Sequence, residues 1–464
     1  MRFLALLACT LLLGCPADEP SIPDAGVVSG FTREQLLDPK SCQECHPDHY
    51  QEWSGSMHAY AAEDPVWLAM NRRGQRETNG ELGDFCVTCH APIALREGLT
   101  TDGLNLAELP AYSKGVTCAF CHFVDEVTGS HNAQLNLSSD LRMRGAYDNP
   151  APNKAHASMY SPLHDKERIE SADLCGSCHD IVTQKQVHLE RTFLEWKSSL
   201  FAHDVEGERQ TCGDCHMKGR TGTAADAPGV PLRRVHDHRM VGVDTALTDF
   251  PEKQDQLRRI QRELNTTALS ILCVRDEEGT VLLGATLENM AAGHSWPTGA
   301  TQDRRAWVEI IAYDEADNVL FASGVVEEGQ ALTSIVDPQL WRLGDQGYDE
   351  DGHAVHLFWE IAEYESLLLP PPNHAHEGPN AGKVGAHLQH EYRFSSAELP
   401  ARVTLRLRLR AIGLDVLDDL IASGDLAPEF RGAVPTFEMG ATQIEWRRAD
   451  MFECVPVGHP PPVP

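Results

Sequence analysis

The chain has 464 residues, and its 69 Asp and Glu residues outnumber its 39 Lys and Arg residues, which gives a formal net charge of −30 at pH 7. An acidic balance of this size excludes a general affinity for nucleic acid or anionic membrane surfaces, and it favours cationic patches on partner proteins. The length predicts two or three domains.

The N-terminus predicts a lipoprotein signal over residues 1–15. Arg2 precedes an apolar run that ends in the sequence LLGC at Cys15, which resembles a lipobox whose cysteine is lipidated. The run is too short to span a bilayer as a helix. Cys9 also closes a lipobox-like stretch, but its apolar run is shorter, and an ordinary secretory signal cut nearby is the other interpretation. Residues 16–34 are rich in Pro, Gly and Asp and predict a flexible tether.

Residues 35–245 contain the pattern Cys-x-x-Cys-His five times. A redox dithiol needs one such pair, and structural zinc needs four ligands per site, so five copies cannot be paired evenly. Haem c attachment needs one copy per haem: two thiols for the vinyl groups and a histidine for the iron. The sequence therefore predicts five covalently bound haem c groups. They are held by Cys42, Cys45 and His46; Cys86, Cys89 and His90; Cys118, Cys121 and His122; Cys175, Cys178 and His179; and Cys212, Cys215 and His216.

The motif region is small for the number of haems that it predicts. Its 211 residues leave about 42 for each motif, too few to form a separate domain around each haem. We therefore expect the haems to form the core, with short helices and loops wrapped on them.

Histidines outside the motifs supply enough candidates for the opposite face of each iron. Seventeen of the 22 histidines remain after the five motif histidines are set aside. Mainly bis-His ligation is expected, because histidine is abundant and Met217 directly follows a motif histidine. His156 and His236 are close rivals of two of the predicted distal ligands. The predicted distal ligands are His58, His164, His238, His294 and His131.

After the motif region the sequence changes in character, and apolar and polar residues begin to alternate. Residues 246–265 predict a helical linker, which could equally pack inside the motif region. Residues 266–455 predict an antiparallel β-sandwich, and residues 456–464 a proline-rich tail. The expected strands include ALSILCV with TVLLGATLE, RAWVEIIAY with VLFASGVV, HLFWEIAEY, GAHLQHEYRF and VTLRLRLRAI, and LDVLDDLIAS is expected to be a helix. The two cysteines left over, Cys273 and Cys454, predict a disulfide in an oxidising compartment.

With these motifs the chain resembles multihaem cytochromes c of the c-554 type, which are related to hydroxylamine oxidoreductase and pentahaem nitrite reductase. The resemblance rests on CQECHPDHYQEWSGSMHA (42–59), KGVTCAFCH (114–122), HASMYSPLHDKERIESADLCGSCH (156–179) and EWKSS…TCGDCHM (195–217). MAAGHSWPTGATQDRRAWVEI (290–310) resembles a β-domain often found after such haem domains. The resemblance implies covalent haems, mostly with two histidines per iron, and electron transfer. Nitrite reductases carry a lysine in place of one motif histidine, whereas all five motifs here end in histidine.

Together these features predict a mainly α or irregular multihaem cytochrome c domain wrapped on five haems, followed by an antiparallel β-sandwich domain. The expected function is electron transfer in the cell envelope by a lipid-anchored protein of the periplasm or outer membrane. Its expected partners are redox proteins, either other cytochromes or quinol-linked donors, with no nucleic acid and no catalytic residues. The alternative is a multihaem oxidoreductase that acts on a small nitrogen or sulfur compound at one five-coordinate haem.

Overall fold

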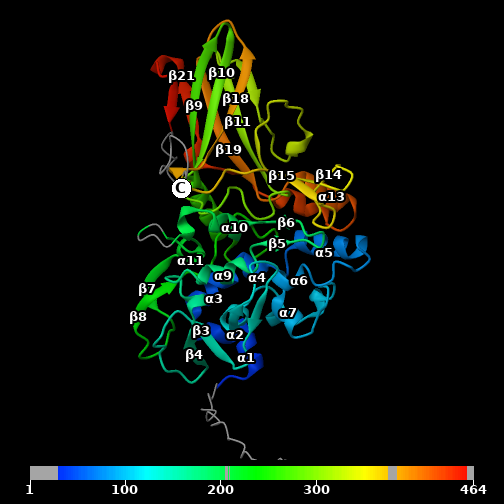
Figure 1. Cartoon of the computed structure of the whole chain (residues 1–464), viewed down its shortest axis with the longest axis vertical. Helices are drawn as coiled ribbons and strands as arrows, with labels where there is room; N and C mark the ends of the chain where they lie inside the picture. The colour runs from blue at the N-terminus through cyan, green and yellow to red at the C-terminus, as the bar shows by residue number, and fades with distance from the viewer. Residues whose placement is uncertain (1–29, 204–206, 208, 375–383, 457–464) are drawn as a thin grey trace, which may run out of the picture.

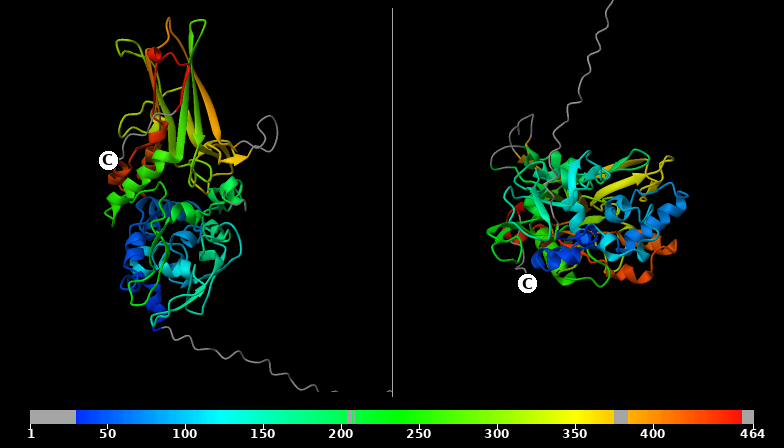
Figure 2. Two further views of the ribbon diagram at one scale, coloured as in Figure 1. Left: turned by 90° about the vertical axis from the view of Figure 1, so that its left-hand side faces the viewer. Right: turned by 90° about the horizontal axis from the view of Figure 1, so that it is seen from below.

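The computed structural model describes residues 30–203, 207, 209–374 and 384–456. Short helices and two-stranded sheets form one end of the molecule, and long antiparallel strands form the other (Figure 1). A view from the side shows the same two parts stacked along the longest axis (Figure 2). The predicted signal with Cys15, and most of the predicted tether and tail, lie outside the described residues.

The N-terminal part is built from short elements. Proline is the first residue of four of its helices, where a missing backbone N–H costs nothing. The helices are α1 (Arg33–Leu37), α2 (Pro39–Gln43), α3 (Pro47–Ser54), α4 (Met57–Tyr60), α5 (Pro65–Glu77), α6 (Val87–His90), α7 (Pro92–Arg96), α8 (Cys118–Phe123), α9 (Ser171–Gly176), α10 (Thr192–Lys197) and α11 (Cys212–His216). The paired strands are β1 (Val124–Val127) with β2 (Leu135–Leu137), β3 (Arg142–Gly145) with β4 (Ala157–Tyr160), β5 (Ile181–Val182) with β6 (His188–Leu189), and β7 (Gly219–Thr223) with β8 (Leu232–His236).

Apolar side chains of this part form several small clusters rather than one core. One cluster gathers Leu37, Phe120 and Phe123 with their neighbours, and another gathers Phe193 and Trp196. A domain of this length normally buries one continuous apolar core. The small clusters instead surround a large internal cavity, which is the arrangement expected of a chain wrapped on cofactors.

Helix α12 (Lys253–Thr267) connects the two parts and packs on the strands. Its Ile260 and Leu264 belong to the main apolar cluster of the C-terminal part. Its side-chain amide at Gln261 donates to the backbone carbonyl of Glu438, 2.7 Å away. The helix that the sequence predicts at this position therefore packs on the strands of the C-terminal part (residues 268–456, called the β-part below), and its Arg262, Glu263 and Thr267 also line the internal cavity.

The C-terminal part contains antiparallel sheets, as predicted. A four-stranded sheet has the order β18-β10-β9-β22, and a larger sheet has the order β14-β13-β11-β19-β20 with β12, β15 and β21 at its sides. Side chains from both sheets share one apolar cluster. The strands are β9 (Ala268–Glu277), β10 (Thr280–Asn289), β11 (Arg305–Tyr313), β12 (Val319–Ser323), β13 (Arg342–Tyr348), β14 (Ala354–Val355), β15 (Glu363–Leu367), β18 (His387–Ser395), β19 (Arg402–Arg410), β20 (Phe437–Glu438), β21 (Ile444–Arg447) and β22 (Cys454–Pro456), with helix α13 (Leu414–Ala422) beside them.

One predicted strand is wrong. HLFWEIAEY was expected to be extended, but most of it forms turns between β14 and β15, and strand pairing resumes only at Glu363. The apolar residues that suggested a strand are Leu357 and Ile361, which are both buried from within the turn. The ring of His356 bonds the side chains of Asp303 and Asp419, which holds this turn against two other elements.

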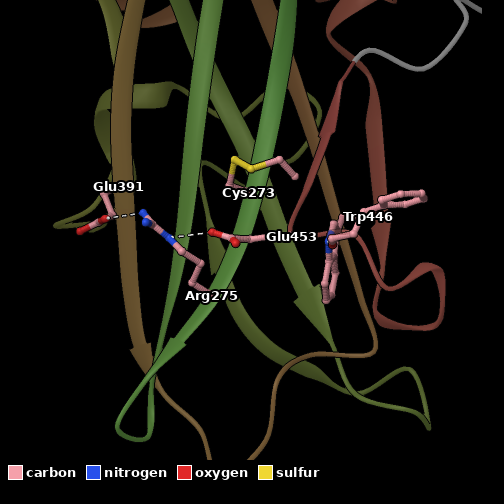
Figure 3. The surroundings of a disulfide bond; sticks show 7 residues. Cys273, Arg275, Glu391, Trp446 and Glu453 are labelled. Carbon is pink, nitrogen blue, oxygen red and sulfur yellow. Dashed lines mark hydrogen bonds and ion pairs between the residues drawn. A yellow bond between two sulfur atoms is a disulfide. The ribbon is translucent and has the colours of Figure 1, made fainter.

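The predicted disulfide is present in the β-part (Figure 3). Cys273 of β9 and Cys454 of β22 are directly paired residues of neighbouring antiparallel strands. Next to them Arg275 lies 3.7 Å from carboxylate oxygens of both Glu391 and Glu453. The bridge ties the start of the first sheet to the end of the described chain, 181 residues later.

Candidate haem site

The five motifs surround one connected cavity of about 1400 Å³. Every motif histidine lines it, together with nine of the ten motif cysteines, and all ten motif cysteines are free thiols. Most of the remaining wall is apolar or aromatic and includes Trp53 and Trp196, the two tryptophans of the repeated Glu-Trp sequence. A space of this size, bounded by thiol pairs and imidazoles, fits several planar groups bonded through cysteine.

The motifs fold locally into single helical turns, which brings both thiols and the histidine to one side. Helices α8 and α11 each begin at the first cysteine of a motif. Thr117 caps the first of these by accepting from the backbone N–H of Phe120, and Thr211 caps the second together with Asp214. The threonine before each of these two motifs therefore fixes where the turn begins.

Four of the five motif histidines have a ring orientation that is fixed by the backbone. Their Nδ1 atoms lie 2.5–3.1 Å from backbone carbonyl oxygens. A carbonyl only accepts, so Nδ1 must donate, and the lone pair of Nε2 is left for a metal. Burial also lowers the pKa of His90 to about 4, which keeps the ring in its neutral, ligating form. The bonded pairs are His46 with Ala224, His90 with Ala61, His122 with Arg144 and His216 with Val241.

Four motif histidines also face a second imidazole across the cavity. Two imidazoles on opposite sides of one metal ion have ring centroids about 6 Å apart, since each metal–nitrogen bond is about 2 Å and each ring adds about 1 Å. The observed separations are 6.2–6.4 Å. The pairs are His46 with His156, His179 with His58, His122 with His238, and His216 with His294.

Three of the predicted distal ligands, His58, His238 and His294, are among these partners. His238 and His294 also bond a carbonyl through Nδ1, at 2.9 and 2.8 Å, so their Nε2 atoms are free. His58 has its Nδ1 2.8 Å from the sulfur of Met240. Its neutral form is favoured because burial lowers its pKa to about 3.

The other two predicted distal ligands are placed less favourably. His164 lies 5.5 Å from His122, but its Nε2 bonds the carbonyl of Cys121 at 2.8 Å and its Nδ1 is buried without a hydrogen-bond partner among the described residues. His131 does not line the cavity, and both of its ring nitrogens lie 3.1–3.2 Å from the amide of Gln134. His156, the rival of His164, occupies the place opposite His46 instead.

The surroundings of His90 differ from those of the other motif histidines. Its ring stacks on Trp67 at 4.7 Å and 13°, and within the described part of the chain no imidazole stands 6 Å from it. Acidic groups lie near the second motif. Glu190 faces the cavity from a backbone with φ of 49°, burial raises its pKa to about 7, and its charge adds to the burial that raises the pKa of Cys86. Asp244 lies close enough to raise the pKa of His90, and both of its oxygens bond Arg304, at 2.8 and 2.9 Å.

Sequence reasoning missed Glu190, Trp67 and Arg304 at this site. Glu190 comes from the end of β6 and Arg304 from the start of β11, more than a hundred residues apart. A single glutamate or arginine carries no local pattern. No other signal pointed to them, because five histidines were available as predicted distal ligands for the five irons.

Thiols of different motifs approach each other closely. Cys42 and Cys118, Cys89 and Cys178, and Cys175 and Cys212 lie close enough to interact, which lowers the pKa of one thiol in each pair and raises that of the other. Burial, and then the charges of Cys178 and Cys175, raise the pKa of Cys121 to about 12. The first motif therefore adjoins the third, the third adjoins the fourth, and the fourth adjoins both the second and the fifth.

None of the helices in the described ranges has the length and apolar character that a bilayer span requires.

Comparison with known proteins agrees with this geometry. Residues 41–123 match the family model for cytochrome c554 and c-prime. A penta-heme cytochrome c552 from Thermochromatium tepidum has a similar structure, with a TM-score of 0.61 and 20% sequence identity over 89% of this chain and 99% of that one. No curated protein matches the sequence. The family match covers the first three motifs, and the structural similarity shows a shared fold.

Proposed function

We propose that this multihaem c-type cytochrome of the c554 type carries electrons through five covalently bound haem c groups in the cell envelope, and exchanges them with redox partner proteins. The observation that carries the proposal is the continuity of the motifs. Each motif touches or closely approaches another through its thiols, and all five share one cavity. When bound, haem c supplies reversible one-electron chemistry at its iron.

The side chains of the cavity would attach and orient the haems and exclude water from them. The motif cysteines would bond each haem, and four of the five motif histidines would ligate it through Nε2 because their Nδ1 atoms are engaged by the backbone. A second histidine would ligate four of the haems from the opposite face. It is His156 at the first motif, His238 at the third, His58 at the fourth and His294 at the fifth. Trp196 is buried and seals part of the wall.

The acidic surface and the N-terminal signal support the cellular setting. The net charge of −30 favours partners with cationic docking patches and steers them at low ionic strength. Lipidation at Cys15, followed by the tether over 16–34, would hold the cytochrome at a membrane surface. The domain division proposed from the sequence places residues 35–245 around the haems and residues 266–455 in the β-part, with a linker at 246–265.

Haem counting and a redox titration test the carrier function. The intact mass of the holoprotein should exceed that of the processed chain by five haem groups. A potentiometric titration should then show all five haems to be reduced and reoxidised reversibly, at a total of five electrons per chain. A stoichiometry below five, or haems that do not exchange electrons with the rest, would contradict the proposal.

A second function is favoured by the second motif alone. His90 stacks on Trp67, and no imidazole among the described residues stands opposite it, which supports a haem with one open iron position. Such a site could oxidise or reduce a small nitrogen or sulfur compound. Spectra of the air-oxidised holoprotein separate the two functions: an open site gives one high-spin iron in five and binds added cyanide, whereas five closed sites give low-spin signals only.

A further inference from the structure

The ring of His356 joins two carboxylates. Its Nδ1 lies 3.0 Å from Oδ1 of Asp303, and its Nε2 lies 3.1 Å from Oδ2 of Asp419. Carboxylate oxygens only accept, so both bonds form together when the ring carries two protons or when one carboxyl carries the second proton. The three side chains therefore share protons along one continuous line of hydrogen bonds.

The two ends of this line lie in different surroundings. The side chain of Asp303 is 6% exposed and lines the internal cavity, whereas that of Asp419 is 42% exposed on α13. Asp303 and Glu190 both line this cavity, and the charge of Asp303 adds to the burial that raises the pKa of Glu190. Phe358, two residues after His356, has its ring 6.5 Å from that of Phe85, the residue before the first cysteine of the second motif. The inner end therefore faces the cavity near the second motif, and the outer end opens to solvent.

We propose that Asp303, His356 and Asp419 form a proton path between the solvent and the part of the cavity beside His90. In one transfer, the O–H bond of Asp419 breaks as an N–H bond forms at Nε2, while the N–H bond at Nδ1 breaks as an O–H bond forms at Asp303. One proton leaves the outer carboxyl and one reaches the inner carboxyl, so the charge of the ring is unchanged. The starting tautomer returns when the ring exchanges protons with solvent, because rotation of the ring moves no proton from Nε2 to Nδ1.

Charged groups on several elements surround the ring. Arg73 of α5 donates to Asp419 and, at 2.7 Å, to Glu77. Glu360, in the same turn as His356, has a pKa raised by burial and by Glu77 and lowered by the histidine. Burial lowers the pKa of His356 itself, but its bonds to the two aspartates outweigh burial and raise it overall. The bonds to the two aspartates therefore favour the ring form that carries both protons, which is one of the two states in which the line of hydrogen bonds is complete.

The proton path has a use because the site beside His90 is buried. This step rests on the proposed function, in which electrons reach the second motif. An electron added to a group out of contact with water leaves a charge that is costly unless a proton compensates it. Burial raises the pKa of Glu190 to about 7 and that of Asp64 to about 6, so carboxyl groups that could take up such a proton line this part of the cavity.

Proton uptake during reduction of the holoprotein tests the path. The oxidised holoprotein is mixed with a reductant in unbuffered solution containing a pH indicator, and haem reduction and proton uptake are followed at separate wavelengths. His356→Gln keeps one hydrogen bond but cannot relay a proton, so uptake should slow by about 100-fold while haem reduction keeps its rate. His353→Gln is the matched control, since this histidine lies three residues earlier with 76% of its side chain exposed, and it should leave both rates unchanged.

Asp419→Asn provides a second route to the same answer if His356→Gln does not fold. It removes the outer carboxyl and leaves the bond between His356 and Asp303, and it should also slow proton uptake without slowing reduction. Uptake at the wild-type rate in either folded variant, or no uptake by the wild type, would overturn the path. Failure of the haems to become reduced would instead count against electron transfer itself, so the two proposals fail in different ways.

Discussion

Replacement of His294 by alanine offers the sharpest test of the haem ligands. His294 lies in the loop after β10, 6.4 Å from His216 and inclined by 11° to it, with Nδ1 bonded to the carbonyl of Ser295 at 2.8 Å. Its imidazole is the iron ligand that the β-part would contribute. His294→Ala removes that ligand and leaves the two thiols and the histidine of the fifth motif intact.

The size of the expected change comes from counting ligands. The wild type has four motif histidines that face a second imidazole and one, His90, that does not. His294→Ala should therefore add one high-spin iron in five to the fraction that the wild type shows. That fraction is one in five where the second motif holds an open haem and none where all five haems are closed, and the number of covalently bound haems stays the same in the variant.

Low-temperature electron paramagnetic resonance of the air-oxidised holoprotein measures this fraction, and intact mass gives the haem count. His353→Ala is the control, because the ring of this exposed histidine bonds the carboxylate of Asp349, at 3.2 Å, far from the motif histidines in the sequence. An unchanged spectrum in His294→Ala, with the full number of haems attached, would refute the assignment and leave the β-part without a ligand to the iron of the fifth motif.

Three further predictions concern stability and location. Cys273→Ser and Cys454→Ser should each lower the free energy of unfolding by up to about 5 kcal/mol on the loop-entropy model for the 181-residue separation, as measured by urea unfolding; equal stability of the oxidised wild type and the variants would contradict it. His356 has a folded pKa above its ordinary value of 6.5, so the stability that it adds is present below pH 6.5 and is lost as the pH rises through the folded pKa. As the pH rises through the folded pKa of His356, the melting temperature should accordingly fall more for the wild type than for His356→Gln. Parallel plots of melting temperature against pH for the two proteins would contradict this prediction. Cys15→Ser should release the protein from the membrane fraction or leave the signal uncut, and membrane retention of a correctly processed variant would argue against lipidation.

The features that the sequence predicted best are those encoded by residues close together in the chain. The five Cys-x-x-Cys-His motifs, the β9–β10 hairpin and the alternation of β19 each depend on residues within a few positions of one another. The disulfide between Cys273 and Cys454 followed from counting, because every other cysteine already had a role. These predictions needed no knowledge of which segments meet in space.

The distal side of the cavity depends on contacts between distant segments, and there the sequence was less informative. His156 and His164 flank the same short segment, and only the path of the chain around β4 decides which of them faces His46. HLFWEIAEY has the composition of a strand, yet bonds from His356 to Asp303 and Asp419 hold it as a turn. A tertiary interaction overrode the local propensity in that segment.

The order of segments around the cavity has a consequence for how the protein is made. All five motifs precede residue 217, whereas one side of the cavity is built by later residues, among them His294, Trp296 and Arg304. Chains emerge and begin to fold from the N-terminus, so the thiols remain open to solvent and to the haem-attachment machinery until the β-part has been exported and has folded. The β-part thus closes the cavity only after the haems have been attached. A chain cut short before the β-part would carry its haems exposed to water.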